Sequence, residues 1–309
     1  MRMRRLGASG LKVSEVGLGC NNFGMRLDEG GTQAVIDAAI EAGITLFDTA
    51  DIYGGTRSEA FLGKALGKRR QEIVLATKFG MQIGDDKQRS GGSRRWIMRA
   101  VEDSLTRLGT DYIDLYQLHR YDPETPVEET LRALDDLVTQ GKVRYIGNSN
   151  FTGWQIADAD WTAAGATRFV SAQNQYSLIE RKVEHEVLPA CEHFGLGFLP
   201  FFPLASGLLS GKYRRGEKPP EGTRLAAWGS RAAAALSDRN FDKVETLTAW
   251  AEARGHTILE LAFAWLLGHE AVSSVIAGAT SAEQIASNAA AGDWQLTPDE
   301  VAEVSKLIA

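Results

Sequence analysis

Short apolar segments alternate with longer amphipathic segments along the whole chain, and this alternation restricts the possible folds more than any other feature. We predict a strand at each of eight short segments: residues 15–20, 45–50, 73–79, 113–119, 145–149, 169–175, 197–203 and 273–278. Between them, apolar residues recur every three or four positions, as in amphipathic helices, and several of these stretches end at a glycine. Eight strands that alternate with helices predict a parallel sheet closed into a (β/α)8 barrel.

The length of the chain, 309 residues, fits a barrel of this kind, which takes roughly 250 residues before insertions. An open doubly wound sheet is the alternative, but it would more usually have fewer strands. We expect residues 1–14 to form a hairpin that closes the bottom of the barrel. Residues 212–240, rich in Gly, Pro and Arg, predict a long insertion after the seventh strand. No segment resembles an interdomain linker, so we expect a single domain over residues 1–309.

The stretch VSEVGLGCNNFG, residues 13–24, is similar to the glycine-rich turn of a dinucleotide-binding Rossmann unit. That turn needs a third small residue so that the following helix can pack against its strand. Asn22 stands at this place, and the helical pattern begins only near Gly30. The stretch is therefore expected to be the end of the first strand and its loop, and not a Rossmann turn.

The charge and the cysteine content exclude several classes of function. A net charge of −6 argues against a nucleic-acid partner, which needs a basic surface. Two cysteines, Cys20 and Cys191, make no disulfide framework, and a cytoplasmic location is the simplest expectation. The basic N-terminus is not followed by an apolar stretch, and no run reaches the ~18 apolar residues of a membrane span, so we expect neither a signal peptide nor a membrane association.

Ionisable residues interrupt three successive apolar runs at the point where each predicted strand ends. The second strand ends near Asp48, with Tyr53 five residues later; the third ends at Lys78 and the fourth at His119. The catalytic groups of (β/α)8 enzymes lie at the carboxyl ends of the strands. A single polar residue there is often structural, but four residues at the same end of neighbouring strands predict a common site.

These four residue types suit the delivery of a proton to a carbonyl oxygen. A neighbouring ammonium, from Lys78, is expected to lower the pKa of the Tyr53 hydroxyl, and Asp48 to keep that lysine charged and in place. His119 would supply a further hydrogen bond to the reacting oxygen. Reduction also needs a hydride source, which no side chain provides, so a nicotinamide cofactor is implied.

In these four residues and in the stretches around them, the chain resembles the aldo-keto reductases, and the resemblance covers essentially its whole length. The stretches that carry the resemblance occur in the order and spacing of that family: GITLFDTADIYG, LATK, DYIDLYQLH, GKVRYIGNSNF, QNQYSLIER and PLASGLLSGKY. The resemblance implies a (β/α)8 barrel in which Asp48, Tyr53, Lys78 and His119 are catalytic and Tyr53 is the general acid. It also points to the branch that includes bacterial reductases and ion-channel β subunits.

The resemblance further implies an NADP site across the mouth of the barrel. Ser149, Asn150 and Gln173 would hold the carboxamide of the nicotinamide, and the ring of Tyr176 would stack on it. The remaining positions that correspond to the family's cofactor contacts would bind the phosphates, the ribose and the adenine: Leu204, Ser206, Gly207, Leu208, Lys212, Gly278, Thr280, Ser281, Gln284 and Asn288. Backbone amides between residues 204 and 208 would hold the pyrophosphate.

At one position the chain departs from the family pattern. Many relatives carry Arg or Lys where Thr280 stands, and such a cation pairs with the 2′-phosphate of NADP. NADPH is still favoured here, with NADH as the alternative, and Arg214, Arg215 or Arg224 of the insertion is expected to replace the missing charge. For the small-molecule carbonyl substrate, the predicted pocket residues are Asn22, Phe23, Tyr121 and Trp228.

Three other functions are weighed against a reductase. A Schiff-base aldolase would use Lys78 as a nucleophile, but then the lysine should stand without a carboxylate beside it. A metal-dependent hydrolase needs clustered ligands, and no such spacing is present, so no metal is expected. A regulatory nicotinamide-binding subunit would keep the same residues with little or no turnover. The sequence predicts neither the oligomeric state nor the physiological substrate.

Overall fold

An eight-stranded parallel sheet forms the centre of the protein, as a computed structural model of residues 1–163 and 165–308 (apart from the side chain of Arg231) describes it. Its strands follow the order β10-β3-β4-β5-β6-β7-β8-β9. Their bounds are Val16–Gly19 for β3, Leu46–Asp48 for β4, Val74–Phe79 for β5, Ile113–Leu118 for β6, Val143–Ser149 for β7, Phe169–Gln173 for β8, Gly197–Phe198 for β9 and Val275–Gly278 for β10. Each of these strands falls on one of the predicted segments.

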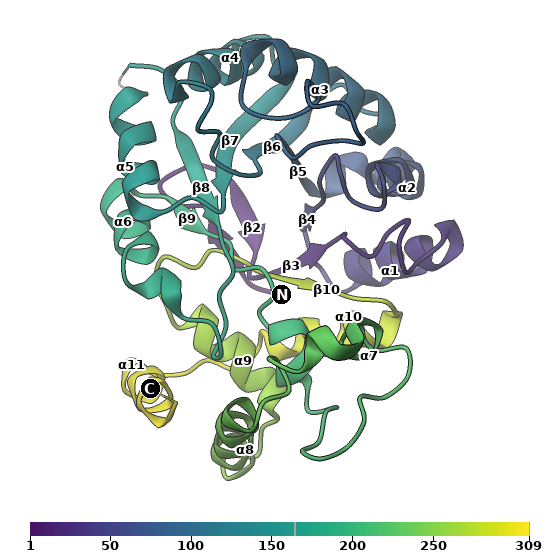
Figure 1. Ribbon diagram of the computed structural model, residues 1–309, viewed down its shortest axis with the longest axis vertical. Helices are drawn as coiled ribbons and strands as arrows, with labels where there is room; N and C mark the ends of the chain where they lie inside the picture. Colours follow the sequence, from purple (N-terminus) through teal and green to yellow (C-terminus); the bar gives the residue numbers. More distant parts are fainter. Residues whose placement is uncertain (164, 309) are drawn as a thin grey trace.

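Helices follow the strands and surround the sheet (Figure 1). Those that directly connect neighbouring strands are α1 (Glu29–Glu41), α2 (Arg57–Leu66), α3 (Arg94–Leu108), α4 (Val127–Thr139), α5 (Gly153–Thr162) and α6 (Val187–Phe194). The later helices are α7 (Arg224–Trp228), α8 (Asp238–Glu252), α9 (Ile258–Leu267), α10 (Ala282–Ala291) and α11 (Pro298–Leu307). Apolar residues recur at helical spacing, and the helices bury these side chains in one hydrophobic core that they share with the strands.

The two end strands of the sheet, β9 and β10, meet and close it. Phe201, just after β9, forms a parallel bridge with Ile276 of β10. The N–H of Ile276 donates to the carbonyl of Pro200 at 3.1 Å, and the N–H of Phe198 donates to the carbonyl of Ala271 at 2.7 Å. The predicted (β/α)8 barrel is confirmed, and the open doubly wound sheet is not found.

A hairpin closes the end of the barrel at which the strands begin. It consists of β1 (Met3–Arg5) and β2 (Lys12–Ser14), which pair antiparallel. Leu6 and Val13 are fully buried and pack in the barrel interior against residues such as Leu115 and Leu199. This confirms the predicted N-terminal hairpin.

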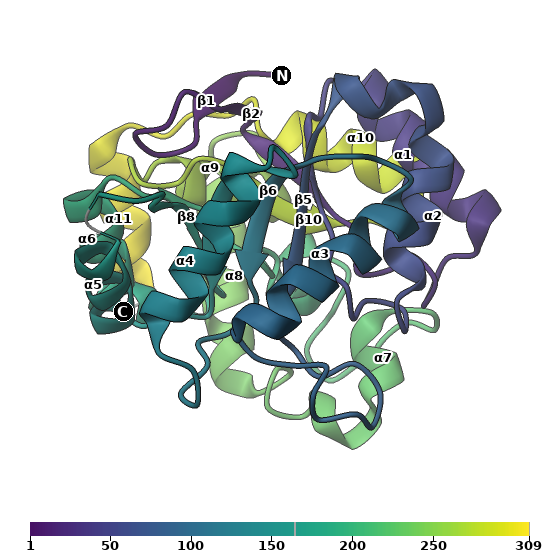
Figure 2. The same ribbon diagram turned by 90° about the horizontal axis from the view of Figure 1, so that it is seen from above.

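The predicted insertion after the seventh strand lies at the opposite end of the barrel. Figure 2 shows α7, its short helix, on the side of the molecule away from β1 and β2. Thr223 caps α7 through its hydroxyl, and the Arg26 side chain donates a hydrogen bond to the carbonyl of Gly222. The insertion is therefore anchored to the loop that follows β3.

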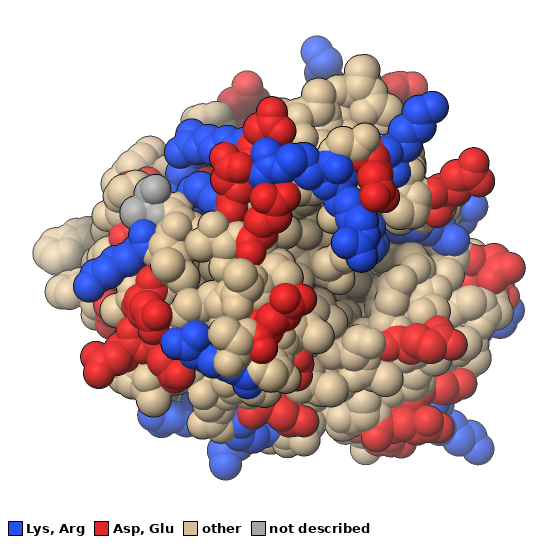
Figure 3. Space-filling view, turned by 90° about the horizontal axis from the view of Figure 1, so that it is seen from below, with Lys and Arg blue, Asp and Glu red and all other residues tan. Residues whose placement is uncertain are grey.

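On the outer surface, basic and acidic side chains are interspersed, as the face in Figure 3 shows. Among the described residues, no helix is both long enough and apolar enough to span a membrane.

Candidate active site

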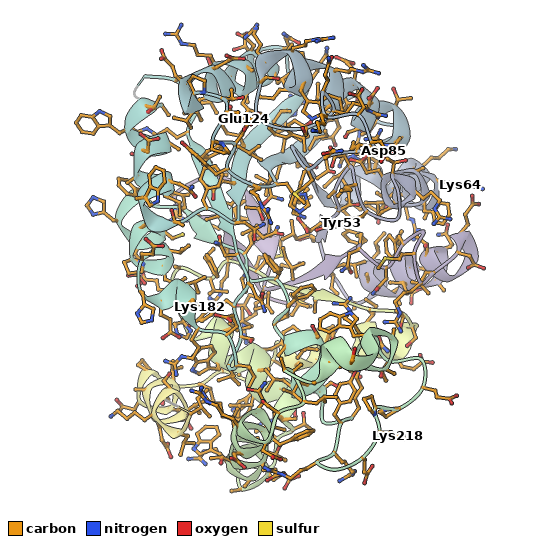
Figure 4. The ribbon with its side chains drawn as sticks, viewed as in Figure 1. Tyr53, Lys64, Asp85, Glu124, Lys182 and Lys218 are labelled. Carbon is orange, nitrogen blue, oxygen red and sulfur yellow. The ribbon has the colours of Figure 1, made fainter. Side chains whose placement is uncertain are left out.

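A cavity of about 750 Å³ opens at the carboxyl ends of the strands. Asp48, Tyr53 and His119 line it, together with the ends of β3, β7, β8 and β10. In Figure 4, Tyr53 lies near the centre of the barrel, whereas the labelled charged residues lie around the rim. Asp48, Tyr53 and His119, three of the four predicted catalytic residues, therefore lie around one cavity.

Lys78 joins the catalytic candidates through its ammonium group. Its Nζ lies 2.5 Å from Asp48 Oδ2 and 2.9 Å from the carbonyl of Thr49, and it donates to the Tyr53 hydroxyl at 3.4 Å. Lys78 is fully buried, so these three oxygens replace its water shell. An isolated nucleophilic amine, which the aldolase alternative requires, is therefore not present.

The strands and one turn explain why these side chains meet. Asp48 ends β4, and Lys78 stands near the end of the adjacent parallel strand β5, in which Ala76 is the partner of Asp48. Tyr53 lies on a turn that returns over these strand ends through Gly54, whose φ is +60°. A Cβ at Gly54 would lie 2.5 Å from the carbonyl oxygen of Phe23, so the turn has room only for glycine.

The charge states follow from burial and from the ion pair. Burial raises the pKa of the Tyr53 hydroxyl, and Lys78 only partly opposes this, so the expectation of a lowered value is wrong. Burial lowers the pKa of Lys78, but Asp48 and Tyr53 raise it by more, and the net direction is upward. At neutral pH the site therefore holds a protonated phenol beside an ammonium ion.

His119 is uncharged in this setting. Its ring meets the ring of Tyr53 edge-on, with centroids 5.8 Å apart. Burial, together with the positive charges of Lys78 and Arg120, lowers the pKa of His119 to about 3. Its buried Nδ1 has no hydrogen-bond partner within the described part of the chain. A neutral imidazole therefore stands beside the Tyr53 ring over the physiological pH range.

Two buried glutamines complete the surroundings of Asp48. The side-chain N–H2 groups of Gln117 and Gln173 donate to Asp48 Oδ1 at 3.0 Å and 2.9 Å. Gln117 is not among the predicted site residues, although a polar residue between Tyr116 and Leu118 in a buried strand is a usable signal. Asp48 is thus fixed by hydrogen bonds on both oxygens.

The outer part of the cavity carries three cations: Arg26, Lys212 and Arg224. In the described residues no carboxylate lies within ion-pair distance of any of them. Partial burial, with the charges of Arg26 and Arg224, lowers the pKa of Lys212. Cations that repel one another in a cleft are stabilised by a bound anion, so these residues fit phosphate groups.

The backbone beside Lys212 has a conformation that suits phosphate as well. Ala205, Ser206 and Gly207, in the short 3-10 helix η3 (Ala205–Ser210), all have positive φ. Successive amides in such conformations form concave anion sites. The N–H groups of Ala205 and Gly207 donate to protein carbonyls, whereas that of Ser206 has no protein acceptor among the described residues. A Cβ at Gly207 would lie 3.0 Å from Lys212 Nζ, so this glycine leaves room for the lysine.

Most of the predicted cofactor residues lie on this cavity. Those that line it are Ser149, Asn150, Gln173, Leu204, Ser206, Gly207, Lys212, Gly278, Thr280, Gln284 and Asn288. Of the predicted substrate residues, Asn22 lines it. Of the three arginines considered as replacements for a cation at position 280, Arg224 lines it, whereas Arg215 is paired with Asp238, Asp242 and Glu245.

Two aromatic predictions are wrong. Tyr176 is fully buried: it packs against Trp265 and Phe198, and its hydroxyl donates to Glu184 at 2.9 Å, so its ring is not available to a nicotinamide. Phe23 is also fully buried and belongs to the hydrophobic core, so it cannot contact a substrate.

Four further predicted residues lie away from the cavity lining. Tyr121 packs edge-on against Phe151 and Trp154, and Trp228 is exposed at the end of α7. The Leu208 side chain is buried, and the Ser281 hydroxyl caps α10 by accepting from the N–H of Gln284. The side chains of Tyr121 and Leu208 therefore serve packing and that of Ser281 serves capping, whereas the contact predicted for the backbone amide of Leu208 stays a prediction.

Further residues line the cavity besides the predicted ones. Phe201 and Phe202 line it, and Arg26 lies at its edge. Residues 197–203 were predicted to be one strand, but β9 ends at Phe198, and Phe202 has a φ of +53°. The turn exposes both phenylalanine rings to the cavity. No group of three or more His, Cys, Asp or Glu side chains in the described chain is arranged to hold a metal ion.

The chain is similar in sequence to known proteins over its whole length. A sequence profile of the Aldo/keto reductase family matches residues 15–309. A probable voltage-gated potassium channel subunit beta from Oryza sativa subsp. japonica is 38% identical over 100% of this chain and 97% of its own length. An uncharacterized oxidoreductase, YrpG, from Bacillus subtilis is 39% identical over 92% and 89%. Versiconal hemiacetal acetate reductase from Aspergillus parasiticus is 37% identical over 97% and 95%. The predicted resemblance, including its branch, is confirmed.

Proposed function

The chain belongs to the aldo/keto reductase family, and from this premise we propose that it reduces an aldehyde or a ketone to the alcohol with a nicotinamide cofactor. The observation that carries the proposal is the position of Lys78, which is hydrogen-bonded to Asp48 and to the Tyr53 hydroxyl inside a cavity. A buried phenol beside an ammonium is a proton donor whose anion is stabilised as it forms.

In the proposed reaction, the Tyr53 hydroxyl gives its proton to the carbonyl oxygen as that oxygen gains negative charge. Lys78 stabilises the phenolate that remains, and Asp48 keeps the ammonium in position. Neutral His119 directs a hydrogen bond to the same oxygen and adds no charge. A reduced nicotinamide bound in the cavity would supply the hydride to the carbonyl carbon.

We propose NADP as the cofactor, with NADPH preferred to NADH. Ser149, Asn150 and Gln173 would hold the nicotinamide carboxamide, and Phe201 and Phe202 would provide the apolar wall for which Tyr176 is not available. The phosphates would contact Arg26, Lys212 and Arg224, whose mutual repulsion a phosphate dianion relieves. This set supports NADPH although Thr280 carries no charge.

We also propose that the chain acts as a single domain on a small carbonyl compound without a metal. The cysteines Cys20 and Cys191 are free and buried, which fits a reducing cytoplasm.

A turnover screen tests the proposed reaction. Purified protein is mixed with NADPH or NADH and with aromatic aldehydes, dicarbonyls, sugars or bulky cyclic ketones, and the loss of reduced-nicotinamide absorbance is followed. We expect turnover with at least one class and a higher kcat/KM with NADPH. If no carbonyl is reduced although the cofactor binds, the reductase proposal is wrong.

That negative result would favour a second function, a nicotinamide-binding regulatory subunit. The observation behind it is the 38% identity to a probable potassium channel subunit beta. Tight cofactor binding without turnover in the same screen would separate a regulatory subunit from an enzyme.

A further inference from the structure

The side-chain amide of Gln117 donates a hydrogen bond to the carboxylate of Asp48, and the proposed reaction gives this amide no role. We propose that Gln117 is a positioning residue of the reductase, which orients both the Asp48–Lys78 pair and the cofactor-side amide of Gln173. This inference rests on the proposed function. It assigns Gln117 no contact with substrate, since Gln117 is fully buried beneath the cavity.

The strand register places Gln117 at the centre of the site. It lies on β6, opposite Lys78 of β5 and opposite Gly147 of β7. A Cβ at Gly147 would lie 3.2 Å from Gln117 Cγ and 2.3 Å from Ser171 Oγ. Because the φ of Gly147 is not positive, the reason for glycine is space. The missing side chain leaves room for the Ser171 hydroxyl and for the Gln117 stem.

Because Gln117 donates to one oxygen of Asp48, the other oxygen is left to Lys78. Asp48 Oδ2 accepts from Lys78, and Oδ1 accepts from Gln117 and Gln173. A buried carboxylate oxygen without hydrogen-bond donors would be costly. Neutral amides satisfy Oδ1 without adding a second cation. The carboxylate therefore stays directed at Lys78, which in turn contacts Tyr53.

The same side chain also fixes the amide of Gln173. Gln173 Nε2 lies 2.9 Å from Asp48 Oδ1 and 3.3 Å from Gln117 Oε1. With its nitrogen held by these two acceptors, Gln173 directs its Oε1 elsewhere, and this oxygen has no protein donor among the described residues. Gln173 lines the cavity, so Oε1 is the group available to accept from a carboxamide N–H2. Gln117 thus links the proton-donating residues to the proposed cofactor contact.

Two substitutions separate positioning from packing. Gln117→Leu keeps much of the volume but removes the amide. Gln117→Glu keeps the shape but presents an acceptor to Asp48, unless the two carboxyl groups share a proton. Gln140→Leu, at an exposed position after α4, is the matched control. For each protein we would measure kcat and KM against pH, the Kd for NADPH, and the thermal unfolding midpoint.

For Gln117→Leu we expect kcat to fall at least about tenfold, as for a lost hydrogen bond to a charged group, with a smaller change in the KM for the carbonyl substrate. For Gln117→Glu we expect a similar loss near neutral pH and a partial recovery, relative to the wild type, as the pH falls. A packing role would not produce that recovery. Both variants should bind NADPH several-fold more weakly.

Wild-type kcat values and pH profiles in both variants would overturn the inference while leaving the reductase proposal intact. If Gln117→Leu does not fold, the isosteric Gln117→Glu variant decides alone. If the wild type turns over no carbonyl, the reductase proposal fails by itself, and the Kd for NADPH then tests Gln117. An unchanged Kd in both variants would reject its role at the cofactor side.

Discussion

The Tyr53 hydroxyl accepts a hydrogen bond from the ammonium of Lys78, and this contact predicts that the hydroxyl acts as the proton donor. In Tyr53→Phe the ring remains and only the proton donor is lost. We expect kcat for carbonyl reduction to fall by at least ~10²-fold, with NADPH affinity near that of the wild type. Steady-state kinetics and a fluorescence titration would measure the two effects.

Tyr121→Phe is the control for this variant, because Tyr121 packs against Phe151 and Trp154 outside the cavity lining. Its activity should stay within about twofold of the wild type, as for other substitutions away from the site. Full activity in Tyr53→Phe would remove Tyr53 from its proposed role.

His119 predicts a dependence of stability on pH. Its pKa is lowered from 6.5 to about 3 in the folded protein, so between these values the unfolded chain binds a proton that the folded protein does not. The folded state therefore loses stability as the pH falls below 6.5. We expect the wild type to lose about 1–2 kcal/mol more than His119→Asn between pH 6.5 and about pH 5, measured by urea unfolding.

His193→Asn controls for the loss of a histidine, since His193 is exposed on α6. It should follow the pH dependence of the wild type. If His119→Asn loses stability as steeply as the wild type, His119 is not a buried neutral imidazole.

At the scale of the elements, we expect the loop between β10 and α10 to contact the 2′-phosphate of the proposed cofactor. Thr280 lines the cavity, and its N–H donates to Gln284 Oε1 at 2.9 Å. In Thr280→Arg a further cation enters a cavity that already holds Arg26, Lys212 and Arg224. We expect NADPH to bind about five- to tenfold more tightly relative to NADH, because only NADPH carries the added phosphate.

Thr280→Gln, with a longer but uncharged side chain, should leave the ratio of the two Kd values unchanged. Isothermal titration with each cofactor measures that ratio. The same ratio in Thr280→Arg and in the wild type would show that position 280 does not meet the 2′-phosphate.

The elements also show how far the sequence could predict this site. Asp48, Lys78 and His119 were predictable because the ends of parallel strands meet at one end of a barrel, whatever the helix packing. Gln117 was missed because its role depends on register, which places it opposite Lys78 and Gly147. Family correspondence suggested that Tyr176 meets the cofactor, but its ring packs against α9, a contact between segments far apart in the sequence.

The turn after β9 could not be predicted either, because the pattern of apolar residues carries no signal for it. The run GFLPFFP is apolar throughout, so it predicts a buried strand. The strand ends instead at Phe198, and the left-handed φ of Phe202 is adopted within the barrel mouth. A conformation that a phenylalanine rarely adopts has no signal in the pattern of apolar residues.

At the scale of the whole molecule, the ion pairs that hold the N-terminal hairpin lie at one end of the barrel and the proposed active site lies at the other. At the closed end, the buried carboxylate of Glu15 accepts from Arg2 at 2.7 Å and from Arg4 at 2.6 Å. These arginines also donate to the carbonyls of Gly292 and Val272. The cluster fastens the hairpin to the segments before β10 and after α10, while the cavity lies at the other end.

This separation predicts opposite results for two substitutions of a single polar side chain. Glu15→Gln leaves two arginines without their carboxylate, and we expect the free energy of unfolding to fall by about 1–3 kcal/mol, measured by urea denaturation. Its kcat/KM, assayed well below the unfolding temperature, should match the wild type, whereas Tyr53→Phe should lose activity with little loss of stability. Glu124→Gln, at an exposed site, is the control and should change neither quantity. If Glu15→Gln also lost most of its activity, the hairpin would have to act on the cavity through the full length of the strands, and the independence of the two ends would be wrong.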